Sequence, residues 1–155
     1  MITKEQVKTA QIEWANGIIK IGKLKDNPTE SKRETEVFVT RLYNYDYGRV
    51  LFKPTRASEK QFRLDKEGAI SYFVGGNQEY PEDTGFALQP WTKIKFDNAD
   101  IIIDENNAVA MGNYYLVDTE NNEVKVEYTI GFVKHDDGSL KINLHHSSFP
   151  YNKNN

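Results

Sequence analysis

The sequence predicts an α+β domain in which helices from the first half of the chain pack on a curved antiparallel sheet built from the second half. Two patterns carry this prediction. In the first half, apolar residues recur at steps of three and four, the spacing of one face of a helix. From Trp91 onward, apolar and polar residues alternate, and clusters of Asn, Asp, Glu and Gly separate the alternating segments, as in a meander of hairpins.

The first predicted element is a long amphipathic helix. Thr3 and Gln6 form a T-x-x-Q capping box, which places the start of a helix at residue 4. An apolar stripe from Val7 to Ile21 extends the helix to about Lys25. The segment 26–28, Asp-Asn-Pro, then ends it, because proline cannot continue the helix.

Shorter elements follow. Ser31 and Glu34 offer a second capping box, and Gly48 is the predicted stop of the helix that they begin. Residues 50–52 are predicted as a short strand. Asp65 is the predicted cap of a third helix that Gly75 and Gly76 end, followed by a loop to residue 90.

Four strands complete the prediction, and turn residues that tolerate positive φ lie between them. The expected strands are 91–103 with a bend at 97–98, 108–117, 124–134 and 140–148. Strands this long that curl against helices form a cone, so a single pocket is expected inside the sheet. The domain is expected to cover residues 1–151, with a disordered tail at 152–155.

Composition excludes several classes of function. The chain has 155 residues and a net charge of −3, and it lacks the basic stripe that would follow a nucleic-acid backbone, so nucleic acid is not expected as a partner. It contains no cysteine, which excludes disulfides and thiolate metal sites. No apolar stretch is long enough to span a bilayer and residues 1–5 do not resemble a signal peptide. A cytoplasmic protein without a membrane partner is therefore expected, unless a leader peptide has been removed.

The last predicted strand carries the best candidates for chemistry. If Leu140 to Leu144 face the core, strict alternation points His146 and Ser148 into the same interior and His145 and Ser147 outward. We therefore expect His146 and Ser148 to line the pocket. The alternative left open is that His146 is a core histidine satisfied by a neighbouring strand.

Four further polar residues are candidates for the pocket. The Thr55 hydroxyl follows a predicted strand and either serves the pocket or closes a local turn. Tyr72 lies on the predicted third helix, either in the site or packed in the core. Asn113 and Tyr115 share one face of a long strand and line the cavity unless cross-strand packing explains them.

Metal-free chemistry is the expectation from the same pattern. Side chains of adjacent residues such as His145 and His146 project to opposite sides of a strand and cannot easily coordinate the same metal ion. His135 lies in a predicted turn, and the carboxylates lie mostly in turns and helix caps. No metal or other cofactor is therefore expected.

Four segments resemble the iota-class carbonic anhydrases. They are 52–55 (FKPT), 71–76 (SYFVGG), 112–115 (GNYY) and 145–150 (HHSSFP). That class is a branch of the SnoaL-like, nuclear-transport-factor-2-like (NTF2-like) superfamily, related to the association domain of calcium/calmodulin-dependent kinase II. The resemblance runs over nearly the whole chain. It implies an NTF2-like cone and metal-free hydration of carbon dioxide to bicarbonate.

Residue roles follow from that resemblance as expectations. Thr55, Tyr72, His146 and Ser148 match the family's pocket positions, with His146 or a water that it holds as the proton acceptor and the hydroxyls as ligands of water and bicarbonate. Apolar walls for carbon dioxide are expected from Trp14, Phe52 and Phe86. A homodimer is expected by analogy with the superfamily.

Two other functions remain open at this point. The first is a non-catalytic ligand-binding or oligomerisation domain on the same fold, as in kinase-association-like proteins. The second is a SnoaL-like isomerase or cyclase, which would need a roomier cavity and a carboxylate inside it.

Overall fold

A computed structural model describes residues 1–154, and Asn155, the last residue of the predicted tail, lies outside the described residues. The helices are α1 (Lys4–Gly22), α2 (Pro28–Leu42) and α3 (Lys66–Val74), with 3-10 turns η1 (Asn44–Asp46) and η2 (Phe86–Leu88). The strands are β1 (Leu51–Lys53), β2 (Trp91–Ile103), β3 (Asn107–Asp118), β4 (Glu123–Lys134) and β5 (Leu140–Ser148). The predicted α+β class is confirmed.

Helix α1 begins where the capping box predicts. The Thr3 hydroxyl accepts from the Gln6 amide at 3.1 Å, and the Gln6 side chain accepts from the Thr3 amide at 2.9 Å. These two bonds satisfy backbone donors that a helix start would otherwise leave free. The helix is shorter than expected, because the segment after Gly22 closes into turns instead of continuing to Lys25.

Helix α2 corrects the second capping prediction. Asn27 is the N-cap and accepts from the Glu30 amide at 3.2 Å, while Pro28 occupies the first turn, where its missing N–H costs nothing. Ser31 therefore lies inside the helix. The helix also ends before Gly48, because Tyr43 leaves the helical conformation and forms a parallel bridge with Ile142.

Helix α3 matches its prediction closely. The Asp65 carboxylate accepts from the Gly68 amide at 2.7 Å, and the helix ends at Gly75, whose φ is +67°. Gly76 follows with a φ of +80°, a conformation that side chains with a Cβ rarely adopt. The predicted loop after it holds one 3-10 turn, η2.

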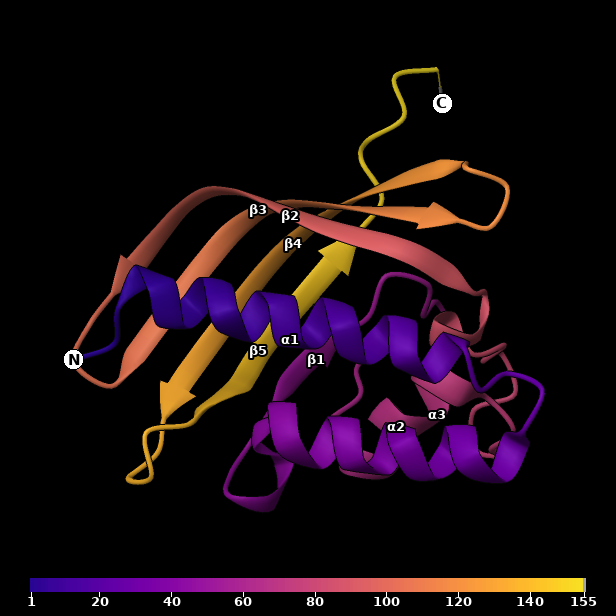
Figure 1. Ribbon diagram of the computed structural model, residues 1–155, viewed down its shortest axis with the longest axis horizontal. Helices are drawn as coiled ribbons and strands as arrows, with labels where there is room; N and C mark the ends of the chain where they lie inside the picture. The colour runs from indigo at the N-terminus through magenta and orange to yellow at the C-terminus, as the bar shows by residue number, and fades with distance from the viewer. Residues whose placement is uncertain (155) are drawn as a thin grey trace.

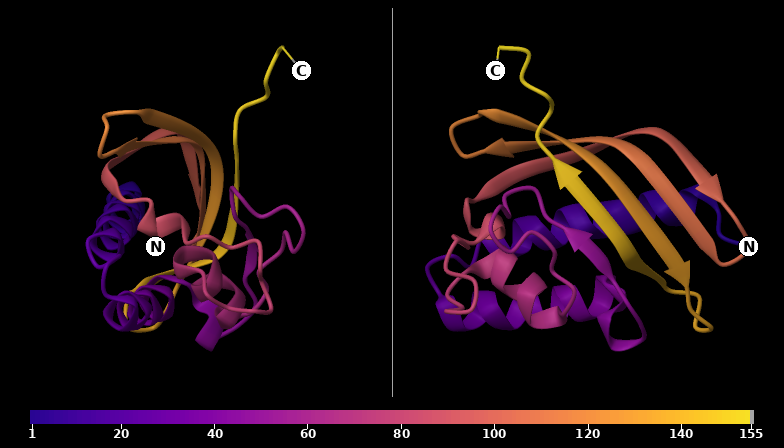
Figure 2. Two further views of the ribbon diagram at one scale, coloured as in Figure 1. Left: turned by 90° about the vertical axis from the view of Figure 1, so that its right-hand side faces the viewer. Right: turned by 180° about the vertical axis from the view of Figure 1, so that it is seen from behind.

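The five strands form one sheet in the order β1-β5-β4-β3-β2. Strands β2 to β5 make the predicted antiparallel meander, and β1 joins it as a parallel neighbour of β5. The sheet curves strongly, and the three helices lie against its inner face (Figure 1, Figure 2). No helix within residues 1–154 is both long and apolar enough to cross a membrane.

Curvature of the sheet depends on an irregularity in β2, at the bend that the sequence predicts. The register between β2 and β3 shifts between Asn98 and Asp100, so that Ala99 is an extra residue opposite Gly112. A Cβ on Gly112 would lie 2.9 Å from the Asn98 Cα and would also press on the Asp97 carbonyl oxygen. The absence of a side chain at position 112 lets the two backbones approach and the strand bend.

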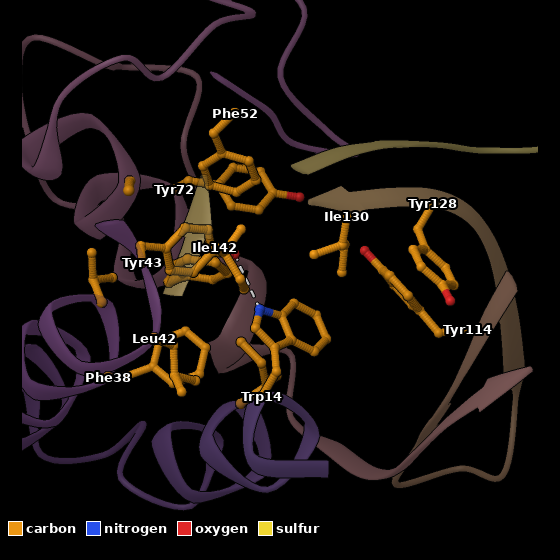
Figure 3. Packing of buried hydrophobic residues seen from close by; sticks show 14 of the residues in the cluster. Trp14, Phe38, Leu42, Tyr43, Phe52, Tyr72, Tyr114, Tyr128, Ile130 and Ile142 are labelled. Atoms are coloured by element: carbon orange, nitrogen blue, oxygen red, sulfur yellow. Dashed lines mark hydrogen bonds between the residues drawn. The ribbon is translucent and has the colours of Figure 1, made fainter. Parts of the chain in front are cut away.

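Aromatic side chains dominate the core between the sheet and the helices. Trp14, Phe38, Tyr43, Phe52 and Tyr114 are all buried, and Figure 3 shows them gathered from different elements around the indole of Trp14. Their rings contact mostly edge to face or tilted, the arrangement that ring quadrupoles favour.

Replacing Gly112 by alanine is expected to destabilise the fold by about 1–3 kcal/mol, because the added Cβ presses on backbone atoms that cannot rotate away. Urea denaturation followed by circular dichroism measures the change. Asn107→Ala, at an exposed position on the same strand, is the control and should alter the free energy of unfolding by less than about 0.5 kcal/mol. Equal stability of the two variants would contradict this account of the bend.

Candidate active site

Strand β5 does not keep the strict alternation on which the sequence analysis relied. Ile142 is buried, as expected, but the next inward-facing residues are His145 and Ser147, each 1% exposed. His146 is exposed and Ser148 is half-buried on the opposite side. The predicted inward orientation of His146 and Ser148 is therefore wrong by one residue.

A β-bulge causes this shift. On β4, Phe132 pairs with Ile142 and the preceding Gly131 pairs with Leu144, so Asn143 is an extra residue without a partner. One inserted residue moves all later side chains to the other face. A Cβ on Gly131 would lie only 3.0 Å from the Leu144 Cβ, so this glycine makes room for the bulge. Glycine inside a strand was the one sequence signal that pointed to the bulge.

Thr55 and Ser147 meet through the parallel pairing of β1 and β5. Lys53 pairs with His146, and the chain then carries Thr55 over the end of β5. The Thr55 and Ser147 hydroxyl oxygens lie 2.8 Å apart, and both side chains are buried. Thr55 lies in a turn at residues 55–56, but its hydroxyl bonds to Ser147, so of the two predicted roles the structure supports a place in the interior.

Tyr72 joins these hydroxyls from α3. Its ring stacks on Phe86 with centroids 5.5 Å apart, and its hydroxyl accepts from the Arg56 amide at 3.2 Å. Burial raises the pKa of Tyr72 well above its ordinary value, opposed in part by hydrogen bonding to the Arg56 amide and to Thr55. The phenol is therefore neutral at physiological pH.

Tyr114 takes the place that was predicted for Asn113 and Tyr115. Even-numbered residues of this part of β3 face the interior, so Tyr114 is buried while Asn113 and Tyr115 are half-buried on the outer face. Burial raises the pKa of Tyr114 to about 12, and hydrogen bonding with Ser147 and Thr55 opposes the rise. The inward assignment of Asn113 and Tyr115 is wrong because the alternation was started on the wrong residue.

We refer to Thr55, Tyr72, Tyr114 and Ser147 together as the hydroxyl cluster. Its members come from β3, β5, α3 and the segment after β1, and each is a neutral group that both donates and accepts hydrogen bonds. Carboxylates do not take part in the hydrogen bonds that these four side chains make within residues 1–154. Such a group of hydroxyls can orient a water molecule and stabilise negative charge on an oxygen.

His145 lies beside the hydroxyl cluster, enclosed by rings. Its imidazole stacks on Phe52 with centroids 5.0 Å apart, and Trp14 meets it edge to face at 5.8 Å. Burial, with a smaller contribution from the neighbouring His146, lowers the pKa of His145 to about 3. An imidazole with so low a pKa is neutral at physiological pH and is a weak proton acceptor.

The three predicted apolar wall residues are buried close to these groups. Trp14 and Phe52 contact the imidazole of His145, and Phe86 lies against Tyr72. Their burial agrees with the prediction. Contact with substrate stays a prediction for all three.

A buried ion pair fixes the loop that carries Thr55. The Arg63 guanidinium is fully buried and donates two hydrogen bonds to Asp83, at 2.7 and 2.8 Å. The Asp83 carboxylate also accepts from the Ser71 hydroxyl, next to Tyr72 on α3. Glu82 accepts from the amides of residues 58–60, which holds the same loop from outside. The sequence analysis missed this pair, because its partners lie in segments without regular structure.

The single pocket that the sequence predicts inside the sheet is not among the pockets found within residues 1–154, so this prediction is not confirmed. Five surface pockets of the described chain lie elsewhere, for example between α2 and α3 and on the outer face of β2 and β3, and none is lined by the hydroxyl cluster. The cluster instead lies among packed aromatic rings, with hydroxyls in direct contact. Entry of a ligand at the hydroxyl cluster therefore requires these packed side chains to move apart.

Residues 1–154 contain no group of three or more His, Asp or Glu side chains placed to hold a metal ion. His135 bonds to the Asn44 side chain at 2.7 Å, outside the hydroxyl cluster.

Comparison with known proteins gives the family. The sequence profile described as metal-independent carbonic anhydrase matches residues 5–149. A metal-independent carbonic anhydrase from Nostoc sp. (strain PCC 7120) is 40% identical over 153 residues, covering 97% of this chain and 75% of that protein. The crystal structure of a cyanobacterial iota-carbonic anhydrase complexed with bicarbonate has a TM-score of 0.95 at 39% identity, covering 98% of this chain and 94% of the other.

More distant structures share the fold alone. A structure assigned as a calcium/calmodulin-dependent kinase II association domain from Xanthomonas campestris has a TM-score of 0.53 at 24% identity, covering 93% of this chain and 82% of the other. An NTF2-like protein from Streptomyces avermitilis has a TM-score of 0.58 at 14% identity, with 96% of each chain covered. The NTF2-like fold and the iota-class resemblance predicted from the sequence are both confirmed. On the profile match over residues 5–149 and the 40% identity to its Nostoc relative, the chain belongs to the metal-independent carbonic anhydrase family.

Proposed function

We propose that the chain hydrates carbon dioxide to bicarbonate without a metal, and that the reaction takes place at the hydroxyl cluster. The contact that carries the proposal is the buried pair of Thr55 and Ser147 hydroxyls, 2.8 Å apart, beside the phenols of Tyr72 and Tyr114. A relative with a TM-score of 0.95 was crystallised with bicarbonate, which is the product of this reaction.

Hydration joins one water to carbon dioxide and releases one proton. In our proposal, the water oxygen forms the new bond to carbon while it is held by the hydroxyls of Thr55 and Ser147. One carbon–oxygen double bond opens, and the negative charge that develops on the oxygen is stabilised by hydrogen bonds from Tyr72 and Tyr114. Both phenols stay protonated at physiological pH, because burial raises the pKa of each, so they serve as donors.

The released proton needs an acceptor other than His145. Its pKa of about 3 makes the imidazole too weak a base to keep a proton at neutral pH. A hydroxyl can accept a proton from water while it passes its own proton on, so Thr55 and Ser147 can relay the proton toward solvent. This proposal replaces the proton-accepting role that the sequence analysis gave to His146, whose side chain is exposed.

Close packing favours carbon dioxide over the two alternatives. A SnoaL-like isomerase or cyclase needs space for a ring and a carboxylate at the reacting centre, whereas the Thr55 and Ser147 hydroxyls contact each other directly. A purely associating domain gives no reason to bury four hydroxyls together, since each buried polar group costs free energy unless it is paired. Carbon dioxide is small and apolar enough to enter when the two hydroxyls move apart.

Metal-stripped protein is expected to hydrate carbon dioxide in a stopped-flow assay. Ser147→Ala is expected to lower kcat/KM by about 10²–10³-fold, because the hydroxyl that holds the attacking water and relays its proton is lost. Ser148→Ala is the matched control, half-buried on the other face of the same strand, and should keep wild-type rates. Activity that disappears on chelation and returns with one added metal ion would overturn the metal-free proposal. Full activity in Ser147→Ala would overturn the proposed site.

The outer face of the sheet is our proposed homodimer interface. Ile102 and Met111 are 71% and 58% exposed, and they lie near Val109 and Leu144 on the face that the helices leave uncovered. Light scattering is expected to give twice the chain mass of 17.9 kDa. Met111→Lys should shift the mass to one chain, whereas Phe62→Lys, also exposed but on a loop, should not. A wild-type monomer would contradict the proposal.

The free energy of unfolding is expected to decrease as the pH is lowered, because His145 is buried in its neutral form. Its pKa is about 3 in the folded chain against an ordinary value of 6.5, so between these pH values the unfolded chain binds a proton that the folded chain does not. The free energy of unfolding therefore decreases as pH falls from about 6.5 toward about 3, and the loss is absent above that window.

Urea denaturation at a series of pH values measures this dependence. His145→Gln should flatten it, and His146→Gln, at the exposed neighbouring position, should change it far less, because burial is the larger cause of the low pKa of His145. An NMR titration of the wild type provides a second measurement, in which the His145 ring signals should not move between pH 8 and about 5. A His145 signal that titrates near 6.5 would contradict the assigned burial.

A further inference from the structure

A line of hydrogen bonds crosses the aromatic core and ends at the hydroxyl cluster. The Trp14 indole nitrogen donates to the Tyr43 hydroxyl at 3.1 Å (Figure 3). The Tyr43 oxygen lies 2.8 Å from His145 Nδ1, and His145 Nε2 lies 3.5 Å from the Tyr114 oxygen. All four side chains are buried, and they come from α1, the end of α2, β5 and β3.

The chemistry of Trp14 sets the direction of this line. An indole N–H only donates, so the Tyr43 oxygen accepts at that contact. The Tyr43 proton then needs an acceptor, and within residues 1–154 the other hydrogen-bond partner of this oxygen is His145 Nδ1. If Nδ1 carried the ring proton instead, the buried Tyr43 proton would have no acceptor, at a cost of about 1–3 kcal/mol. Nδ1 is therefore the acceptor.

The imidazole then has a single donor, at Nε2. A neutral imidazole carries one N–H, and burial keeps His145 neutral, with a pKa of about 3. Phe52 stacks on the ring at 5.0 Å and Tyr43 at 6.1 Å, so the plane of the ring is fixed as well as its tautomer. The Nε2–H is directed at the Tyr114 oxygen.

We propose that Trp14, Tyr43 and His145 form a one-directional donor chain that turns the Tyr114 hydroxyl proton toward Thr55 and Ser147. An oxygen that accepts from Nε2–H points its own O–H away from the imidazole, and the other hydrogen-bonding neighbours of Tyr114 are Thr55 and Ser147. On the function proposed above, this is where the oxygen of bicarbonate is held. Trp14 and Tyr43 are positioning residues, since they act on the reacting oxygen only through His145 and Tyr114.

The donor chain is tested first without any activity measurement. Nitrogen-15 NMR of the wild-type histidines reports which ring nitrogen carries the proton, and His145 is expected to be the Nε2–H tautomer. Tyr43→Phe keeps the aromatic ring but removes the hydroxyl, so His145 should lose this single tautomer. Tyr45→Phe is the matched control, because the Tyr45 ring stacks on Tyr43 while its hydroxyl donates to the Arg63 carbonyl, outside the chain.

Kinetics test the positioning role. Tyr43→Phe is expected to lower kcat about tenfold with little change in KM, a smaller loss than removal of a donor at the reacting oxygen. Trp14→Phe, which removes the first donor, should change the His145 tautomer in the same direction and supplies a second variant if Tyr43→Phe does not fold. Tyr45→Phe should retain the wild-type kcat.

Each outcome separates the donor chain from the proposed function. If His145 of the wild type is protonated at Nδ1, the donor chain is overturned, whatever the rate of carbon dioxide hydration. A lost tautomer with unchanged kcat in Tyr43→Phe would overturn the positioning role. A wild-type Nε2–H tautomer combined with full activity in Ser147→Ala would support the donor chain and overturn the proposed site.

Discussion

The β-bulge at Asn143, opposite Gly131, is the constraint on which the site depends. It places His145 and Ser147 in the interior and leaves His146 and Ser148 outside. Without the extra residue, the same strand would present the other pair to the core. A single unpaired residue therefore decides which histidine meets the aromatic rings and which hydroxyl meets Thr55. Glycine at position 131 supplies the space that this arrangement needs.

The site also requires that its buried polar groups are hydrogen-bonded. The hydroxyl cluster and His145 together supply two phenols, two aliphatic hydroxyls and an imidazole. Within residues 1–154 every fully buried side-chain polar atom has a hydrogen-bond partner. The same burial keeps the phenols protonated and the imidazole neutral. The interior thus carries donors and acceptors but no net charge, which suits a site that receives an apolar gas and stabilises an anion as it forms.

Most of the fold could be predicted from the sequence because local signals specified it. Capping by Thr3 and Asp65, the glycine pair after α3 and the period-two pattern of the four long strands act over a few residues. The site was harder to predict from the sequence. The face to which a strand side chain points depends on the register of the strand, and one inserted residue reverses that face. Thr55 and Tyr72 are buried, as a place in the site requires, and their contact with substrate stays a prediction. The partners of Tyr43 and Arg63 lie far away in sequence, which no local pattern reveals.

Thr55 and Ser147 are 92 residues apart in sequence and meet only through the parallel pairing of β1 with β5. Contacts of such wide separation form slowly, because the entropy of closing the loop is lost before the contact contributes. The antiparallel hairpins from β2 to β5 join neighbours along the chain and can form early. The centre proposed for the reaction is therefore expected to assemble after the hairpins, since it needs the β1–β5 pairing in addition to the antiparallel sheet.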